Sequence, residues 1–115
     1  MHEIGIAQEV LRIIEEQARA YGSGAVRSAR LSVGALSGVV PESLAFALEV
    51  CAKGTRAEGM KMVIRNVPAR GICRGCGHEW DFAPGQMECP ACRAGEIRLS
   101  GGDDLRVDSF EMEDL

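Results

Sequence analysis

The chain has 115 residues, of which 46% are hydrophobic, and a formal net charge of −4. This length suits one domain, or one domain with a small appendage, and the hydrophobic fraction excludes a disordered chain. No apolar stretch approaches the roughly 18 residues that cross a bilayer, and Glu3, Gln8 and Glu9 interrupt the place where a signal peptide would be apolar, so we expect a cytoplasmic protein without a membrane partner.

The first predicted elements are a helix and a strand. Apolar residues recur at steps of three and four between Glu3 and Tyr21, which is the spacing of an amphipathic helix, and Gly22 ends the pattern. The segment VRSARLSVG, at 26–34, alternates between apolar and polar side chains. Such alternation predicts a strand with one buried face, with Ser32 on the polar face.

A second helix and a second strand follow. Pro41 suits the first helical position, and Glu42 favours the positive end of the helix dipole. The side of this helix that we expect to be buried holds Leu44, Ala47, Leu48 and Cys51. We interpret Cys51 as a small buried apolar residue. The segment MKMVIRNV, at 60–67, alternates again and predicts the second strand.

The rest of the chain predicts a cysteine module and a third strand. Residues 69–98, the cysteine module, are rich in glycine, cysteine and proline and show no helical period. The segment LRVDSFEM, at 105–112, alternates and then shifts phase at Phe110, which predicts a strand with a bulge near Ser109. We expect an α+β fold. Residues 1–68 and 99–115 would form a small domain of two helices and a three-stranded antiparallel sheet, into which a zinc-ribbon-like module of two C-x-x-C knuckles is inserted at 69–98.

Four of the five cysteines form two close pairs, each with the spacing C-x-x-C, and twelve residues separate the pairs. Two such turns can direct four thiolates at one centre, and a tetrahedron of sulfur suits zinc. The predicted ligands are Cys73, Cys76, Cys89 and Cys92. Roughly thirty residues bury little core, so we expect Zn²⁺ to be structural, with a redox dithiol as the less favoured alternative. A closed zinc site offers no open position for catalysis, and we predict that the chain is not an enzyme.

Zinc ribbons often bind nucleic acid, and the charge of the module bears on that alternative. Between residues 69 and 98 the sequence has four arginines and four acidic residues, and a Zn²⁺ ion with four thiolates adds a net negative charge. No basic surface results, so we predict no nucleic-acid partner. We interpret Trp80 and Phe82 as packing residues and His78 as a solvated loop residue, while a role for His78 at the zinc site stays open.

The amino terminus begins MHEIGI and places a histidine second. The α-amino group of Met1, the amides of the first residues and the imidazole of His2 can form fused chelate rings around one metal ion. Nitrogen ligation in a plane suits Ni(II) or Cu(II). The alternative is that His2, as a residue at a chain end, binds nothing.

Several segments, in order over nearly the whole chain, resemble the HypA/HybF family of hydrogenase nickel-insertion proteins. They are MHEIGI, VGALSGVVPESLAFALEVCAKGTRAEG, NVP before the first knuckle, the CRGC and CPAC pairs, and GGDDLRV. The resemblance implies a nickel metallochaperone that passes Ni²⁺, its cargo, to the large subunit of [NiFe] hydrogenase with the GTPase HypB. It leaves open whether urease maturation proteins are also partners.

The resemblance also assigns roles to residues. It implies that His2, the Met1 amine and neighbouring amides hold nickel, that Glu3 contributes its amide or tunes the site, and that the cysteine pairs hold zinc. Gly5 departs from the family, which often has serine there, and glycine weakens the start of a helix by up to about 1 kcal/mol relative to alanine. The alternative function is a zinc-ribbon adaptor that binds protein or nucleic acid without nickel chemistry.

Overall fold

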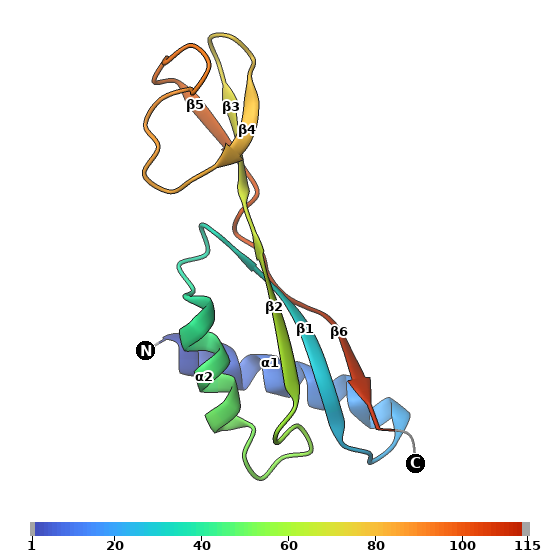
Figure 1. Ribbon diagram of the computed structural model, residues 1–115. Coiled ribbons are helices and arrows are strands. Elements are labelled where there is room, and N and C mark those ends of the chain that lie inside the picture. Colours follow the sequence, from blue (N-terminus) through green and yellow to red (C-terminus); the bar gives the residue numbers. More distant parts are fainter. Residues whose placement is uncertain (1, 114–115) are drawn as a thin grey trace.

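The computed structural model describes residues 2–113, and the side chains of residues 3–113. The elements, in chain order, are α1 (His2–Ala18), the 3₁₀ helix η1 (Arg19–Tyr21), β1 (Val26–Gly34), α2 (Pro41–Cys51), β2 (Lys61–Val67), β3 (Ala69–Cys73), β4 (Glu79–Phe82), β5 (Ile97–Ser100) and β6 (Leu105–Met112). The molecule is elongated, 57 × 27 × 18 Å, with both helices at one end and β3, β4 and β5 at the other (Figure 1). In the part of the chain that the structure describes, no helix is both long and apolar enough to cross a membrane.

The main sheet has the strand order β2-β1-β6. The predicted α+β class, with two helices and a three-stranded sheet, is therefore confirmed for the described residues. The prediction that the sheet is antiparallel throughout is wrong, because β1 pairs with β6 antiparallel but with β2 parallel. The reason is the connection: α2 carries the chain back along the sheet between β1 and β2, and such a crossover joins parallel neighbours.

The bulge predicted near Ser109 is confirmed. Arg30 pairs with Ser109 and the next residue of β1, Leu31, pairs with Val107, so Asp108 is the extra residue of β6. The hydroxyl of Ser32 donates to the carboxylate of Asp108, and this bond, followed by one from Arg106, lowers the pKa of Asp108. Ser32 is consequently fully buried, although its place on the polar face of the strand predicted exposure.

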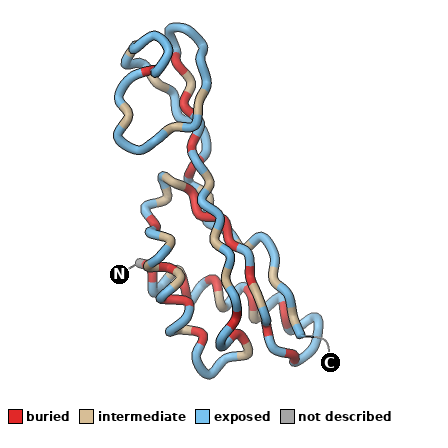
Figure 2. The backbone as a smooth tube through the Cα atoms, in the orientation of Figure 1, coloured by how far each residue is buried: buried red, intermediate tan, exposed pale blue. Residues whose placement is uncertain are grey.

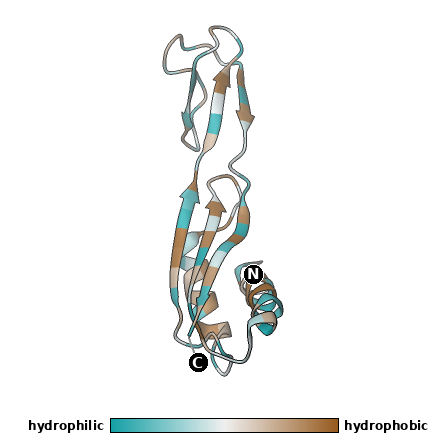
Figure 3. Ribbon diagram, turned by 90° about the vertical axis from the view of Figure 1, so that its right-hand side faces the viewer, coloured by the Kyte–Doolittle hydropathy of each residue, from teal (hydrophilic) through white to brown (hydrophobic). Residues whose placement is uncertain are grey.

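The hydrophobic core lies between the two helices and one face of the main sheet. Figure 2 shows buried segments where the helices face the strands, and Figure 3 shows hydrophobic and hydrophilic residues alternating along the strands. The largest fully buried apolar side chains in this core are Ile14, Leu31, Leu44, Leu48, Val26 and Val33. Cys51 differs from our interpretation, because it is only half-buried at the border of the core.

A small sheet with the order β4-β3-β5 forms the other end of the molecule. Both pairings are antiparallel, and the sheet runs from Ala69 to Ser100. The indole of Trp80 lies over Gly71, where a Cβ atom would stand 2.8 Å from the ring. Trp80 also donates from Nε1 to the side-chain oxygen of Gln86 at 2.9 Å, which agrees with its interpretation as a packing residue.

The two sheets meet at a junction formed by the loop after β1 and the segment before β6. The backbone N–H of Gly34 donates to the carbonyl of Asp104, and that of Leu36 donates to the carbonyl of Gly102, each at 2.6 Å. Ala35 donates to Val67 at 2.8 Å, where the chain leaves the main sheet. Both chain passages between the sheets are therefore tied to one loop.

Adding a methyl group at Gly34 tests how tightly this junction is packed. A Cβ atom there would lie 2.2 Å from the carbonyl oxygen of Gly102, which is backbone and cannot rotate away. We expect Gly34→Ala to lower the free energy of unfolding by about 1–3 kcal/mol, the usual cost of overpacking. Urea titration of the metal-loaded protein, followed by circular dichroism, measures the change.

Gly5→Ala is the matched control, because a methyl group at Gly5 of α1 meets no atom within 4 Å. Alanine is the better helix former by up to about 1 kcal/mol, so this variant should unfold at the same or a higher urea concentration. Equal unfolding midpoints for Gly34→Ala and the unmodified protein would contradict the tight junction.

Candidate metal centres

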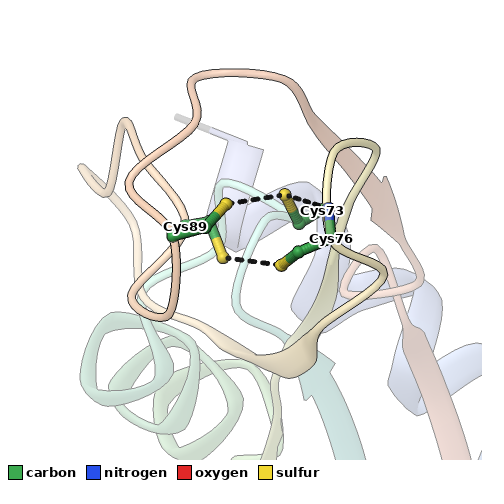
Figure 4. A group of neighbouring side chains, drawn as sticks. Cys73, Cys76 and Cys89 are labelled. Atoms are coloured by element: carbon green, nitrogen blue, oxygen red, sulfur yellow. Dashed lines mark hydrogen bonds between the residues drawn. The ribbon is translucent and has the colours of Figure 1, made fainter.

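The structure brings four cysteine sulfur atoms together at the far end of the small sheet. The sulfur atoms of Cys73, Cys76, Cys89 and Cys92 all lie within 4.8 Å of one another. Figure 4 shows three of these side chains pointing toward a common centre. The Sγ atoms of Cys73 and Cys92 are 3.6 Å apart, and those of Cys76 and Cys89 are 3.7 Å apart. All five cysteines of the chain are free thiols, so no disulfide competes for these atoms.

These distances fit a tetrahedral zinc ion. With Zn–S bonds of about 2.3 Å, the edge of a regular ZnS₄ tetrahedron is about 3.8 Å. A disulfide would require a separation of about 2.05 Å. The donor set is also soft and complete, since four thiolates leave no position for water. The geometry therefore suits a closed, structural metal centre.

Each C-x-x-C knuckle is a tight turn that aims backbone N–H groups at its first sulfur. Gly75 and Cys76 donate to the Sγ atom of Cys73 at 3.3 and 3.4 Å, and Ala91 donates to that of Cys89 at 3.3 Å. Four residues after each first cysteine, Gly77 and Arg93 have positive φ angles of 79° and 65°. Both return a hydrogen bond to the carbonyl of that cysteine, so the two knuckles have the same backbone design.

The backbone donors also set the acidity of the thiols. Hydrogen bonds from the N–H groups of Cys76 and Gly75 outweigh the effect of burial and lower the pKa of the Cys73 thiol to about 7. The pKa of Cys92 is raised to about 12, because the neighbouring sulfurs of Cys73 and Cys76 outweigh the N–H of Ala94, which lowers it. A metal ion that binds all four thiolates must therefore release protons, so its affinity should fall as the pH falls.

Two of the four cysteines in this cluster are buried, and two face solvent. Cys73 and Cys89 are at most 1% exposed, whereas Cys76 and Cys92 are exposed. His78 lies outside this cluster among the described residues: its imidazole is stacked on Trp80 with the ring centres 5.6 Å apart, and its carbonyl accepts from the N–H of Cys73. The exposed sulfurs place one side of the cluster at the molecular surface.

The predicted nickel ligands fall largely outside the described part of the molecule. Met1 and the side chain of His2 lie outside it. Glu3 is described, and it is only 6% exposed in the first turn of α1. It lines a groove against α2 that the sequence analysis missed. The signal for the groove was the pair Phe46 and Val50, which are apolar but lie off the predicted buried side of α2.

Comparisons with known proteins cover both ends of the molecule. The family model "Hydrogenase/urease nickel incorporation, metallochaperone, hypA" matches residues 1–112. The hydrogenase maturation factor HypA of Geobacter metallireducens is 42% identical over 113 residues, covering 98% of this chain and 100% of the relative. The factor of the same name from Streptomyces avermitilis is 40% identical over 116 residues, covering 99% of this chain and 88% of the relative.

Solved structures resemble the fold as a whole. The solution structure of the Ni metallochaperone HypA from Helicobacter pylori superimposes with a TM-score of 0.63 and covers 96% of both chains. A second solution structure, of a HypA protein, superimposes with a TM-score of 0.60. Their sequence identities to this chain are only 18% and 19%, so what these two structures share with it is the fold.

Removing one sulfur ligand tests the metal centre. We expect Cys73→Ser to lose most of its bound Zn²⁺, since a hydroxyl stays protonated where the thiol ionises readily. Structural zinc contributes about 10–16 kcal/mol of apparent binding free energy in small fingers, so the small sheet should lose its fixed structure while the helical core survives. Zinc analysis and amide NMR spectra measure the two effects.

Cys51→Ala is the matched control, because Cys51 lies in α2 and apart from the four-cysteine cluster. This variant should keep one zinc ion per chain and the full set of amide signals. Loss of zinc from Cys51→Ala, or full retention by Cys73→Ser, would show that the ligands are assigned wrongly.

Proposed function

The chain belongs to the HypA family of hydrogenase and urease nickel-incorporation metallochaperones, and from this premise we propose that it binds Ni(II) at its amino terminus and delivers it to the large subunit of [NiFe] hydrogenase. The observation that carries the proposal is the extent of the family match. It runs over residues 1–112 and so includes both the terminal histidine and the cysteine pairs. Nickel is cargo in this scheme, and zinc stays with the protein.

The proposed nickel ligands are the Met1 amine, the His2 imidazole and the backbone amides of the first residues, with Glu3 tuning the site. Glu3 supports this choice, because it is buried in the first turn of α1 and lines the groove against α2. This packing fixes the backbone that directly follows His2.

A site at a chain end suits delivery better than storage. It has no preformed cage, so a recipient with better ligands can take the ion. By the Irving–Williams order such a site would prefer copper to nickel, so the selectivity for nickel must come from metal availability and from the recipient. We propose the GTPase HypB as the partner in transfer. Urease maturation proteins are a further class of recipient, in line with the family description.

Zinc is proposed as the resident metal of the four-cysteine centre, where it holds the small sheet. Sulfur separations of 3.6 and 3.7 Å support this assignment, because they match the edge of a zinc–thiolate tetrahedron. Zn²⁺ that is bound by four thiolates supplies cross-linking and no Lewis-acid chemistry. This chain's own residues then do the work of delivery by binding and releasing nickel at the other end of the molecule.

Replacing His2 tests the nickel site. We expect His2→Ala to weaken Ni(II) binding by at least about 100-fold, because the imidazole closes the last chelate ring, while zinc content and unfolding stay unchanged. Isothermal titration with NiCl₂ on protein with a native amino terminus measures the affinity. Acetylation of that terminus should weaken binding as well, since it removes the amine ligand.

His78→Ala is the matched control, because His78 is the only other histidine of the chain and lies outside the cysteine cluster. It should bind nickel as tightly as the unmodified protein. If His2→Ala kept its nickel affinity, or if His78→Ala lost it, the terminal site would be refuted.

The two metal sites should also be separable in function. We expect a Cys73→Ala, Cys76→Ala double variant still to bind nickel at His2, because α1 keeps its own apolar core. Its nickel affinity should change at most severalfold. Hydrogenase maturation should fail, since the disordered small sheet no longer supports docking to the recipient. A hydrogenase activity assay in cells that carry the variant tests this, and full maturation with a zinc-free protein would contradict it.

A further inference from the structure

An exposed apolar surface lies where α1 begins beside α2. Ile4, Phe46 and Val50 are 48%, 68% and 48% exposed. Together with Glu3, Glu42, Ser43, Ala47 and Cys51 they line a groove of about 470 Å³, which we call the α1–α2 groove. Single exposed apolar side chains are common, but a contiguous set shared by two helices marks an interaction site.

The spacing of the lining residues fits an elongated occupant. Ser43, Phe46, Ala47 and Val50 stand at i, i+3, i+4 and i+7 and share one side of α2. At 1.5 Å per residue this side extends about 10 Å, or two helical turns. A partner helix packs along such a side with its own apolar residues at the same spacing.

The rim of the groove is acidic. Glu42 lines it and is exposed, Glu49 is exposed on α2 one turn from Phe46, and the described lining contains no lysine or arginine. Glu3 also lines the groove but is buried. An occupant with cationic side chains beside an apolar stripe complements this rim. A second copy of the chain would place the acidic rim against itself, which electrostatic complementarity disfavours.

The described part of the chain itself cannot fill the groove. Glu113 donates to the carbonyl of Ala25, which ties the end of β6 to the start of β1. Figure 1 shows this end of the main sheet at the opposite side from the start of α1. Among the described residues, the end of β6 is therefore held away from the groove.

We propose that the α1–α2 groove docks an amphipathic helix of a partner protein, with apolar residues at i, i+3, i+4 and i+7 and flanking lysines or arginines. The purpose of this docking rests on the proposed nickel delivery. Glu3 belongs to the groove and directly follows His2, so a helix in the groove lies within about one turn of the proposed nickel ligands. Docking thereby places the recipient's metal ligands next to the cargo.

A synthetic peptide tests the groove directly. The probe is a fluorescein-labelled 18-residue peptide with leucines at i, i+3, i+4 and i+7 flanked by lysines, and its control has every lysine replaced by glutamate. Fluorescence anisotropy is measured with the full-length, zinc-loaded protein. We expect the lysine peptide to bind at least tenfold more tightly than the glutamate peptide, and added salt to weaken its binding.

Variants locate the binding surface. Phe46→Ser should weaken binding of the lysine peptide at least tenfold, whereas Tyr21→Ser should leave it unchanged, because Tyr21 is an aromatic residue that is 77% exposed but lies outside the groove. Glu42→Lys should reduce or invert the preference for the lysine peptide. Circular dichroism establishes that each variant is folded before its affinity is compared.

Nickel titrations on the same variants separate this inference from the proposed function. Phe46→Ser should keep its nickel affinity, and His2→Ala should keep its peptide affinity. Equal binding of the two peptides, or equal effects of Phe46→Ser and Tyr21→Ser, would overturn the groove and leave the nickel site standing. Dimerisation that Phe46→Ser abolishes in sedimentation experiments would assign the groove to a second copy and overturn the proposal. Nickel binding that survives in His2→Ala would instead refute the proposed function.

Discussion

The main sheet depends on a strand that the chain reaches only by way of the cysteine centre. β1 is the central strand, and the backbone hydrogen bonds on both of its edges form only when β6 pairs with it on one side and β2 on the other. The chain leaves this sheet at Val67 and returns at Leu105, and everything between belongs to the small sheet and its junction. A metal that holds Cys73 near Cys92 shortens this excursion and brings β3 and β5 side by side. Closing such a loop is an entropic cost that the metal centre offsets.

The junction connects the small sheet with the loop that leads to α2. Leu36 and Gly34 bind the segment before β6, and the same loop continues into α2 at Pro41. α2 in turn forms one wall of the α1–α2 groove, and Glu3 of α1 lies against it. A displaced small sheet would therefore disturb the loop that positions α2 without touching a nickel ligand. The two ends of the molecule are linked through backbone hydrogen bonds and packed glycines, which have little freedom to adjust.

Much of this architecture can be predicted from the sequence, and the exceptions have physical causes. Helices and long strands follow from apolar periodicity, and the cysteine spacing identifies residues that the fold does bring together. The direction of β2 does not follow from alternation, which is the same in parallel and antiparallel pairs. The signal for it was the strand–helix–strand order, since a helical crossover joins parallel neighbours. Ser32 is buried through a bulged residue from a distant strand, which no local pattern reveals. The short strands β3, β4 and β5 were not predicted, because four or five residues show too little alternation to identify a strand.

The two proposed metal sites differ in chemistry as well as in place. Four thiolates in a closed tetrahedron suit a metal that stays, whereas nitrogen donors at a chain end suit one that leaves. X-ray absorption at the nickel edge, on zinc-loaded protein with a native amino terminus and one equivalent of Ni(II), tests this division most directly. We predict a first shell of nitrogen and oxygen atoms without sulfur, and full retention of zinc. A sulfur shell around nickel, or release of zinc on nickel addition, would place the cargo at the cysteine centre and contradict the division.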